Sequence, residues 1–361
     1  MLPAVLWLLA ACSGSEGVIE DFRNEGHGVF VLCEGNYQSG NSTLSYYDPQ
    51  TRQVENGIFQ RANDRRLGDT GQGITVSGDA AYIAVENSGI VWKLDTGTFR
   101  VRGQLTASDT EHMVNPRYVH LVSEHKAYVT DLYSPYITVF DPVTMQATGS
   151  ISTGQPTTYG YSSTEQVVQW GTRVYTNCWC YSRQILVIDT EQDLVVDSIT
   201  LPTSWQPKRM VVDSDARLWV ITDGGYGSEA GSFGDNIPHL YRIDLATQTI
   251  ESDWAMDSDE ASVELALDPT GKTLYIVNND IYRMSTSDSH PPVRPFIEAP
   301  TDSNGTRHKL YGISVDPSSG DIYVADAVDY SQSGVVYRYS PDGELADQFR
   351  VGINPNGFAF K

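Results

Sequence analysis

A short aromatic segment recurs along the chain, and this repeat limits the possible folds more than any other feature. From Phe30 to Tyr323 an aromatic residue among aliphatic and β-branched neighbours returns about every 49 residues. Apolar runs of four or five such residues are typical of buried β-strands. The seven copies lie at 29–32, 81–85, 127–130, 174–177, 218–221, 274–277 and 322–325.

Each copy has the same neighbours, which together describe a four-stranded unit. An apolar strand and a turn rich in Asp, Pro and Gly come before it in most units, and a polar loop and a third strand follow it. Five of the third strands end in Asp, which opens a turn into a more polar fourth strand; these strands are 44–48, 91–95, 137–141, 185–189 and 240–244. Because no segment shows helical periodicity, the repeat predicts an all-β, seven-bladed β-propeller with four antiparallel strands per blade.

The C-terminal tail resembles an eighth inner strand with no followers. The first repeat lacks an inner strand, because Phe30 already belongs to its second strand. We therefore expect residues 352–360 to complete the first blade, to bury Ile353, Phe358 and Phe360, and to close the ring without open edges. Residues 28–361 then form one propeller domain.

The N-terminus reads as an export signal. Residues 2–11 form an apolar run about half as long as a membrane-spanning helix. The sequence Leu9-Ala10-Ala11-Cys12 and the small polar residues after it resemble the lipobox of bacterial lipoproteins, although the usual basic start is missing. The resemblance implies a signal peptide at 1–11 and a lipidated Cys12 with a tether at 12–27. An ordinary secretory signal with an incidental cysteine is the alternative. The acidic tether is similar to those of outer-membrane lipoproteins that face the cell exterior.

The net charge of the chain argues against nucleic acid as a partner. The chain has 24 Lys and Arg against 46 Asp and Glu, a net charge of −22. Such a surface repels phosphate backbones, and the densest basic cluster, Arg61, Arg65 and Arg66, is too small to bind nucleic acid.

Three cysteines remain besides Cys12: Cys33, Cys178 and Cys180. Because their number is odd, the sequence leaves any disulfide pairing open.

The sequence predicts a binding protein, with no enzyme activity and no metal or cofactor. It contains no G-x-S-x-G, H-E-x-x-H, Walker A or G-x-G-x-x-G motif. The seven histidines are scattered along the chain. Paired carboxylates can come from any position in a fold, so the motif search leaves acid–base catalysis as a minor alternative.

The loops after the second strands and between blades vary in length, are rich in aromatic residues and should share one face. Acidic residues recur there at nearly one register, at Glu34, Glu86, Asp131, Asp223 and Asp326. They either cap turns or form a ring of acceptors around the channel mouth. Our predicted ligand-binding residues are Glu34, Asn36, Tyr37, Asp131, Tyr133, Trp179, Tyr181, Trp205, Tyr226 and Tyr330.

Two segments carry a family resemblance. Residues 28–36 and 40–48 are similar to the first blade of a family of surface lipoprotein propellers, with Cys33 in place of an Asn in the usual Asn-Glu-Gly-Asn motif. The pattern at 128–141 is similar to the YncE-like propellers. Among these, BtuG-type proteins capture cobalamin outside the cell and pass it to a TonB-dependent outer-membrane transporter.

The resemblance covers nearly all of the chain after the signal peptide, but its motifs specify the fold better than the ligand. It implies a cell-surface lipoprotein that captures cobalamin or another corrinoid, with a TonB-dependent transporter as partner and the lipid as its membrane contact. Aromatic residues suit the methyl groups of a corrin, and Glu34 and Asp131 are candidate acceptors for its amides. A glycan-binding or protein-docking propeller is the alternative.

Overall fold

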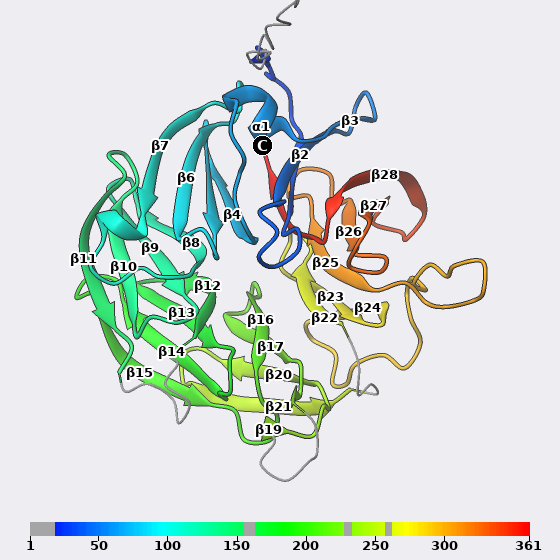
Figure 1. The fold of residues 1–361 in the computed structure, drawn as a ribbon. Coiled ribbons are helices and arrows are strands. Elements are labelled where there is room, and N and C mark those ends of the chain that lie inside the picture. Colours follow the sequence, from blue (N-terminus) through cyan, green and yellow to red (C-terminus); the bar gives the residue numbers. More distant parts are fainter. Residues whose placement is uncertain (1–18, 155–162, 227–232, 257–261) are drawn as a thin grey trace, which may run out of the picture.

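The computed structural model describes residues 19–154, 163–226, 233–256 and 262–361. It confirms the predicted seven-bladed β-propeller of four-stranded antiparallel blades, whose inner strands surround a central channel (Figure 1). From the inner to the outer strand, blade 1 contains β29 (Pro355–Phe360), β1 (Val29–Cys33), β2 (Thr43–Asp48) and β3 (Gln53–Glu55). Blade 2 contains β4 (Gly71–Ser77), β5 (Ala80–Val85), β6 (Ile90–Asp95) and β7 (Val101–Thr106). Blade 3 contains β8 (Pro116–Ser123), β9 (Lys126–Asp131), β10 (Tyr136–Asp141) and β11 (Gln146–Ser152).

The later blades follow the same order with two local changes. Blade 4 contains β12 (Thr164–Trp170), β13 (Arg173–Cys178), β14 (Gln184–Asp189) and β15 (Leu194–Thr200). Blade 5 contains β16 (Pro207–Val212), β17 (Arg217–Thr222), β20 (His239–Asp244) and β21 (Thr249–Ala255), with a small extra pair, β18 (Gly225–Tyr226) and β19 (Phe233–Gly234). Blade 6 contains β22 (Val263–Leu267), β23 (Thr273–Asn278) and β24 (Asp280–Ser285), and Ile297 pairs with Ile281 at its outer edge through an isolated bridge. Blade 7 contains β25 (Leu310–Val315), β26 (Ile322–Asp326), β27 (Ser333–Tyr339) and β28 (Leu345–Ile353).

The C-terminal tail closes the ring as predicted. In β29, Phe360 pairs with Val29 and Ala359 with Phe30, so the last strand is the inner strand of the first blade. The predicted boundary was wrong, because Ile353 still belongs to β28 and pairs with Ser333. Ile353 is therefore only partly buried at the end of an outer strand, and the inner strand starts at Pro355.

The third-strand aspartates open turns, also as predicted. Asp48 Oδ1 accepts hydrogen bonds from the backbone N–H groups of Gln50 and Thr51. Asp189 Oδ1 does the same for Glu191 and Gln192 in blade 4. The repeated Asp thus supplies the local bonds that turn the chain into each fourth strand.

Apolar packing lies between neighbouring blades. The aromatic residues of the second strands are buried there, and Trp219 and Tyr323 are fully inaccessible. Helix α1 (Ile58–Asn63) was not predicted, because six residues are too short for a visible helical period. Its Ile58 and Phe59 nonetheless join the core between blades 1 and 2.

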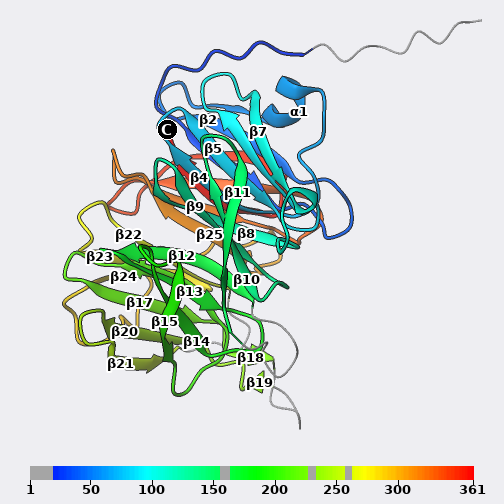
Figure 2. The ribbon, with the colours of Figure 1, turned by 90° about the vertical axis from the view of Figure 1, so that its left-hand side faces the viewer.

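The described part of the predicted tether runs along the propeller (Figure 2). Glu20 forms an ion pair with Arg61, and the Phe22 ring lies 5.1 Å from that of Phe99. His27 contacts Asp316 at 2.7 Å and the carbonyl of Lys361. The predicted signal peptide and Cys12 lie outside the described residues. In the part of the chain that is described, no helix is long and apolar enough to cross a membrane.

The three remaining cysteines are free thiols. Burial raises the pKa of Cys33 and Cys178 to about 12 and that of Cys180 to about 11. All three are therefore thiols rather than thiolates at neutral pH.

Candidate ligand-binding site

One register position in the inner strands places polar side chains around the channel. It is the second residue of each inner strand, and in six of the seven blades a β-bulge falls there. A bulge redirects a side chain away from the regular alternation of a strand. The residues at this position are Gln72, Arg117, Glu165, Lys208, Glu264, Tyr311 and Asn356.

These seven residues line a cavity of about 360 Å³ at one end of the channel, which we call the mouth. The loops after the second strands of five blades complete its wall, which confirms that these loops meet on one face. They contribute Glu34, Tyr37, Glu86, Leu132, Tyr133, Trp179 and Asp223, and the inner strands add Tyr118 and Arg209.

Ion pairs tie neighbouring blades together at the mouth. Arg117 pairs with Glu86 and, through Nε at 2.8 Å, with Glu165. Burial alone would lower the pKa of Arg117, but the charges of Glu165 and Glu86 raise it above its ordinary value. Arg209 and Lys208 both pair with Glu264, the latter at 3.2 Å. The buried Arg117 and the partly buried Lys208 and Arg209 are therefore held in fixed positions by carboxylates.

Glu34 has neutral partners instead. Its carboxylate accepts hydrogen bonds from the Tyr311 hydroxyl at 3.0 Å and from Asn356 Nδ2 at 2.6 Å. Among the described residues, no Lys, Arg or His side chain lies within ion-pair distance of it. Burial raises the pKa of Glu34, and the charge of Glu34 in turn raises that of Tyr311 well above its ordinary value.

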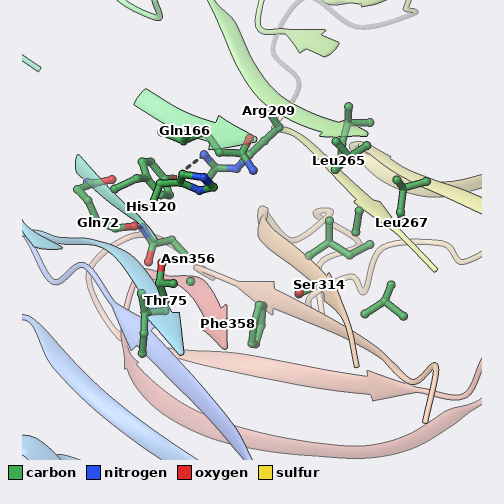
Figure 3. A pocket seen from close by; sticks show the side chains of 18 of the residues that line it. Gln72, Thr75, His120, Gln166, Arg209, Leu265, Leu267, Ser314, Asn356 and Phe358 are labelled. Atoms are coloured by element: carbon green, nitrogen blue, oxygen red, sulfur yellow. Dashed lines mark hydrogen bonds between the residues drawn. The ribbon is translucent and has the colours of Figure 1, made fainter. Parts of the chain in front are cut away.

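A second cavity of about 370 Å³, the lower chamber, continues the channel beyond the mouth (Figure 3). Gln72, Tyr118, Arg209 and Asn356 border both cavities. Arg209 Nη1 donates to the Tyr118 hydroxyl at 2.7 Å, which links blades 5 and 3 across the channel. Aliphatic side chains such as Leu265 and Leu267 form much of the chamber wall, so the chamber is much less charged than the mouth.

The structure brings four of the predicted ligand-binding residues together at the mouth: Glu34, Tyr37, Tyr133 and Trp179. The rings of Tyr181 and Tyr226 pack against each other at 5.4 Å outside the mouth lining. Trp205 lies under the guanidinium of Arg183 at 4.9 Å and also lies outside the lining.

The remaining predicted residues organise the loops. Asn36 donates from Nδ2 to the carbonyl of Tyr330 at 2.6 Å, and the Tyr330 ring meets Tyr311 edge to face. Asp131 is 1% exposed and its carboxylate accepts four backbone N–H groups, which leaves no access for a ligand amide. The expectation that Asp131 binds ligand is therefore corrected by its burial, and its role is to order the loop.

Some of the recurring acidic residues cap turns, and others line the channel mouth. Asp131, Asp223 and Asp326 accept backbone N–H groups in their own loops. Asp223 also lines the mouth and accepts from Trp179 Nε1 at 2.8 Å, which fixes the indole. Glu34 and Glu86, one methylene longer, reach the mouth with their carboxylates.

Sequence reasoning missed the charged residues of the inner strands. Arg117, Glu165, Lys208 and Glu264 each stand second in an inner strand. A polar residue at one fixed register of several repeats is a signal that aligning the repeats by their inner strands would have revealed.

The mouth thus presents carboxylates, cations and aromatic rings around one opening. The described ranges contain no group of three or more His, Cys, Asp and Glu residues able to hold a metal ion.

Comparison with known proteins gives the family. The family described as DUF5074, a domain of unknown function, matches residues 27–353. The chain belongs to the DUF5074 family. No curated protein matches its sequence.

Several solved bacterial structures are similar to this DUF5074 protein. A quinonprotein alcohol dehydrogenase-like protein from Bacteroides thetaiotaomicron has 16% identity over 92% of this chain and 78% of its own, with a TM-score of 0.66. A putative 6-phosphogluconolactonase from Bacteroides fragilis has 14% identity over 93% and 98%, with a TM-score of 0.66. The periplasmic gluconolactonase of Pseudomonas aeruginosa has 11% identity over 93% and 99%, with a TM-score of 0.65. At these identities the similarity establishes the propeller fold.

Proposed function

We propose that this DUF5074 protein captures a small ligand at the channel mouth and that the ligand is a corrinoid. The observation that supports the proposal is the convergence of Tyr37, Tyr133 and Trp179, from the loops of three blades, with carboxylates around one opening. Aromatic and acceptor groups gathered from several blades form a broad site suited to a flat ligand.

The chemistry of the mouth suits a corrinoid. A corrin presents methyl groups, which pack on aromatic rings, and primary amides, which donate hydrogen bonds to carboxylates. A cavity of about 360 Å³ is near the lower limit for ligand pockets. The macrocycle therefore lies across the mouth, with its amide-bearing edge directed toward Glu34.

The same proposal covers location and partners. Lipidation at Cys12 anchors the protein to the outer membrane, facing the cell exterior, and a TonB-dependent transporter receives the ligand. We propose capture as its role, and the ion pairs hold the mouth cations in place. These fixed charges hold the shape of the site.

Cyanocobalamin tests this function directly. A soluble form carrying Cys12→Ala is mixed with cyanocobalamin, and binding is followed by isothermal titration calorimetry and by co-elution of visible absorbance in gel filtration. Saturable binding that Trp179→Ala weakens supports the proposal. The absence of heat and of co-elution at ligand concentrations up to the millimolar range overturns it.

A carbohydrate ligand is the second candidate, and the size of the mouth favours it. About 360 Å³ encloses one or two sugar rings, which stack on aromatic residues and bond to carboxylates and arginines. A glycan array screened with the same soluble protein distinguishes the two candidates.

A further inference from the structure

Glu34 differs electrostatically from the other carboxylates of the mouth. Glu86, Glu165 and Glu264 each form an ion pair, whereas no described cation lies within ion-pair distance of Glu34 and only the more distant charge of Arg117 acts on it. A carboxylate offers about four lone-pair positions. The Tyr311 hydroxyl and the Asn356 amide occupy one position on each oxygen, so Glu34 retains capacity for further donors.

Aromatic rings flank this carboxylate. The rings of Tyr311 and Tyr330 lie 5.6 Å apart at 84°, so they present two walls at nearly a right angle. Tyr330 is 40% exposed and packs on Tyr311, which lines the mouth together with Tyr37, itself 61% exposed. Rings around a carboxylate form the environment that binds substituted ammonium ions, through cation–π attraction and charge.

The surroundings reinforce this preference. A cation already approaches this cluster, because Lys208 Nζ lies 5.9 Å from the centre of the Tyr311 ring while Glu264 neutralises it. The mouth lining includes five carboxylates and three basic side chains, so the cavity as a whole attracts cations. Asn356 is 8% exposed, and among the described residues its buried Oδ1 has no hydrogen-bond partner.

We propose that Glu34, Tyr311 and Tyr330 form a binding site for an organic monocation, a substituted ammonium group carried by a small molecule. Glu34 supplies the counter-charge, and the two rings contact the N-alkyl groups. Asn36, through its bond to the Tyr330 carbonyl, holds the loops of blades 1 and 7 together around the site. The site goes beyond corrinoid capture and does not depend on it.

Choline and its neutral isostere 3,3-dimethyl-1-butanol test the charge requirement. Both are titrated into the soluble Cys12→Ala form by calorimetry, with the Tyr330 ring signals followed by NMR. We expect saturable choline binding and at least about tenfold weaker binding of the isostere, as for other cation–π sites that combine rings with a carboxylate. Equal binding of the two compounds, or no binding of choline, overturns the proposal.

Variants locate the site. Glu34→Gln keeps the size of the side chain and should weaken choline binding by about tenfold. Glu344→Gln removes the same charge from an exposed turn of blade 7 and should leave binding unchanged. Tyr330→Leu should weaken binding roughly three- to thirtyfold, whereas Tyr330→Phe, which keeps the ring, should retain it.

The two proposals fail separately. Thermal melting confirms that each variant is folded, and the comparison of Tyr330→Leu with Tyr330→Phe keeps the test decisive if Glu34→Gln is unstable. Choline binding that Glu344→Gln lowers as much as Glu34→Gln overturns the site, because a general field effect then explains it. Cyanocobalamin binding is measured independently, and its loss or presence does not alter the choline result.

Discussion

The side-chain amide of Asn356 donates to Glu34 Oε1 over 2.6 Å, although the two residues stand 322 positions apart. Asn356 belongs to β29, the strand that closes the ring, and Glu34 follows β1, with which β29 pairs. The same pairing that completes the first blade therefore also positions a carboxylate of the mouth. Ring closure is therefore also required to place Asn356 next to Glu34.

Deleting residues 355–361 should cost far more stability than trimming an ordinary terminus. The deletion exposes the edge of β1 and removes Ala359 from the core between blades 1 and 2. We expect aggregation or a melting temperature lowered by more than 10 °C, about the effect of several kcal/mol in a chain of this size. Ala359→Asp, at a buried position, should reproduce most of the loss, whereas Leu345→Asp, on an exposed strand end, should not. Thermal unfolding followed by circular dichroism gives the melting temperatures of the deletion and of the two point variants. An unchanged melting temperature of the deletion would contradict ring closure by β29.

Arg117→Met should lower the free energy of unfolding by about 3–5 kcal/mol, because it leaves Glu86 and Glu165 buried without their cation. Arg102 also pairs with two carboxylates, Asp79 and Asp95, but at the surface. Arg102→Met should therefore cost less than about 1 kcal/mol. Urea denaturation measures both, and equal losses would show that burial of the mouth network is unimportant.

Acidification should stabilise the wild type relative to Glu34→Gln. Burial raises the pKa of Glu34 above its ordinary value of 4.5, so the folded state holds this proton more tightly than the unfolded chain. The ionised carboxylate is thus a cost above the raised pKa, and this cost disappears as the pH falls through that pKa toward 4.5. Urea midpoints of both proteins between pH 8 and about pH 5 check the sign. A difference that does not change with pH would contradict it.

Trp179→Ala should weaken cyanocobalamin binding by roughly ten- to a hundredfold, since one ring buried on corrin methyls contributes about 1–3 kcal/mol. Trp205→Ala should have little effect on cyanocobalamin affinity, because Trp205 lies beneath Arg183 and outside the mouth. Tyr82→Leu, in a buried strand, should reduce stability and leave affinity unchanged. Isothermal titration calorimetry measures the cyanocobalamin affinity of the three variants. Equal affinity for all of them would show that the ligand binds elsewhere.

Cys12→Ala should move the protein from the membrane fraction to the soluble periplasmic fraction, because the acyl chains supply the proposed anchor. Fractionation followed by a high-salt wash and immunoblotting measures the distribution. Membrane association that survives the substitution and the wash would contradict lipidation at Cys12.

The sequence by itself determined the architecture. Apolar strands of fixed order, turn-forming residues such as Asp48 and Asp189, and an extra strand at the C-terminus specify seven closed blades, because these signals are local and repeat. It also indicated which loops share a face, since that follows from strand order. It predicted a convergence of loop aromatics, of which Tyr37, Tyr133 and Trp179 line the mouth, whereas Tyr181, Trp205 and Tyr226 lie outside it.

The tertiary structure decided which side chains reach the channel. Whether Asp131 caps its own loop or faces a ligand depends on backbone directions that its local sequence does not encode. Bulges at the second residue of the inner strands direct Arg117 and Glu165 inward, and their partners come from other blades. Such ion pairs form only when neighbouring blades have packed side by side, so their residues look like ordinary polar positions in the sequence.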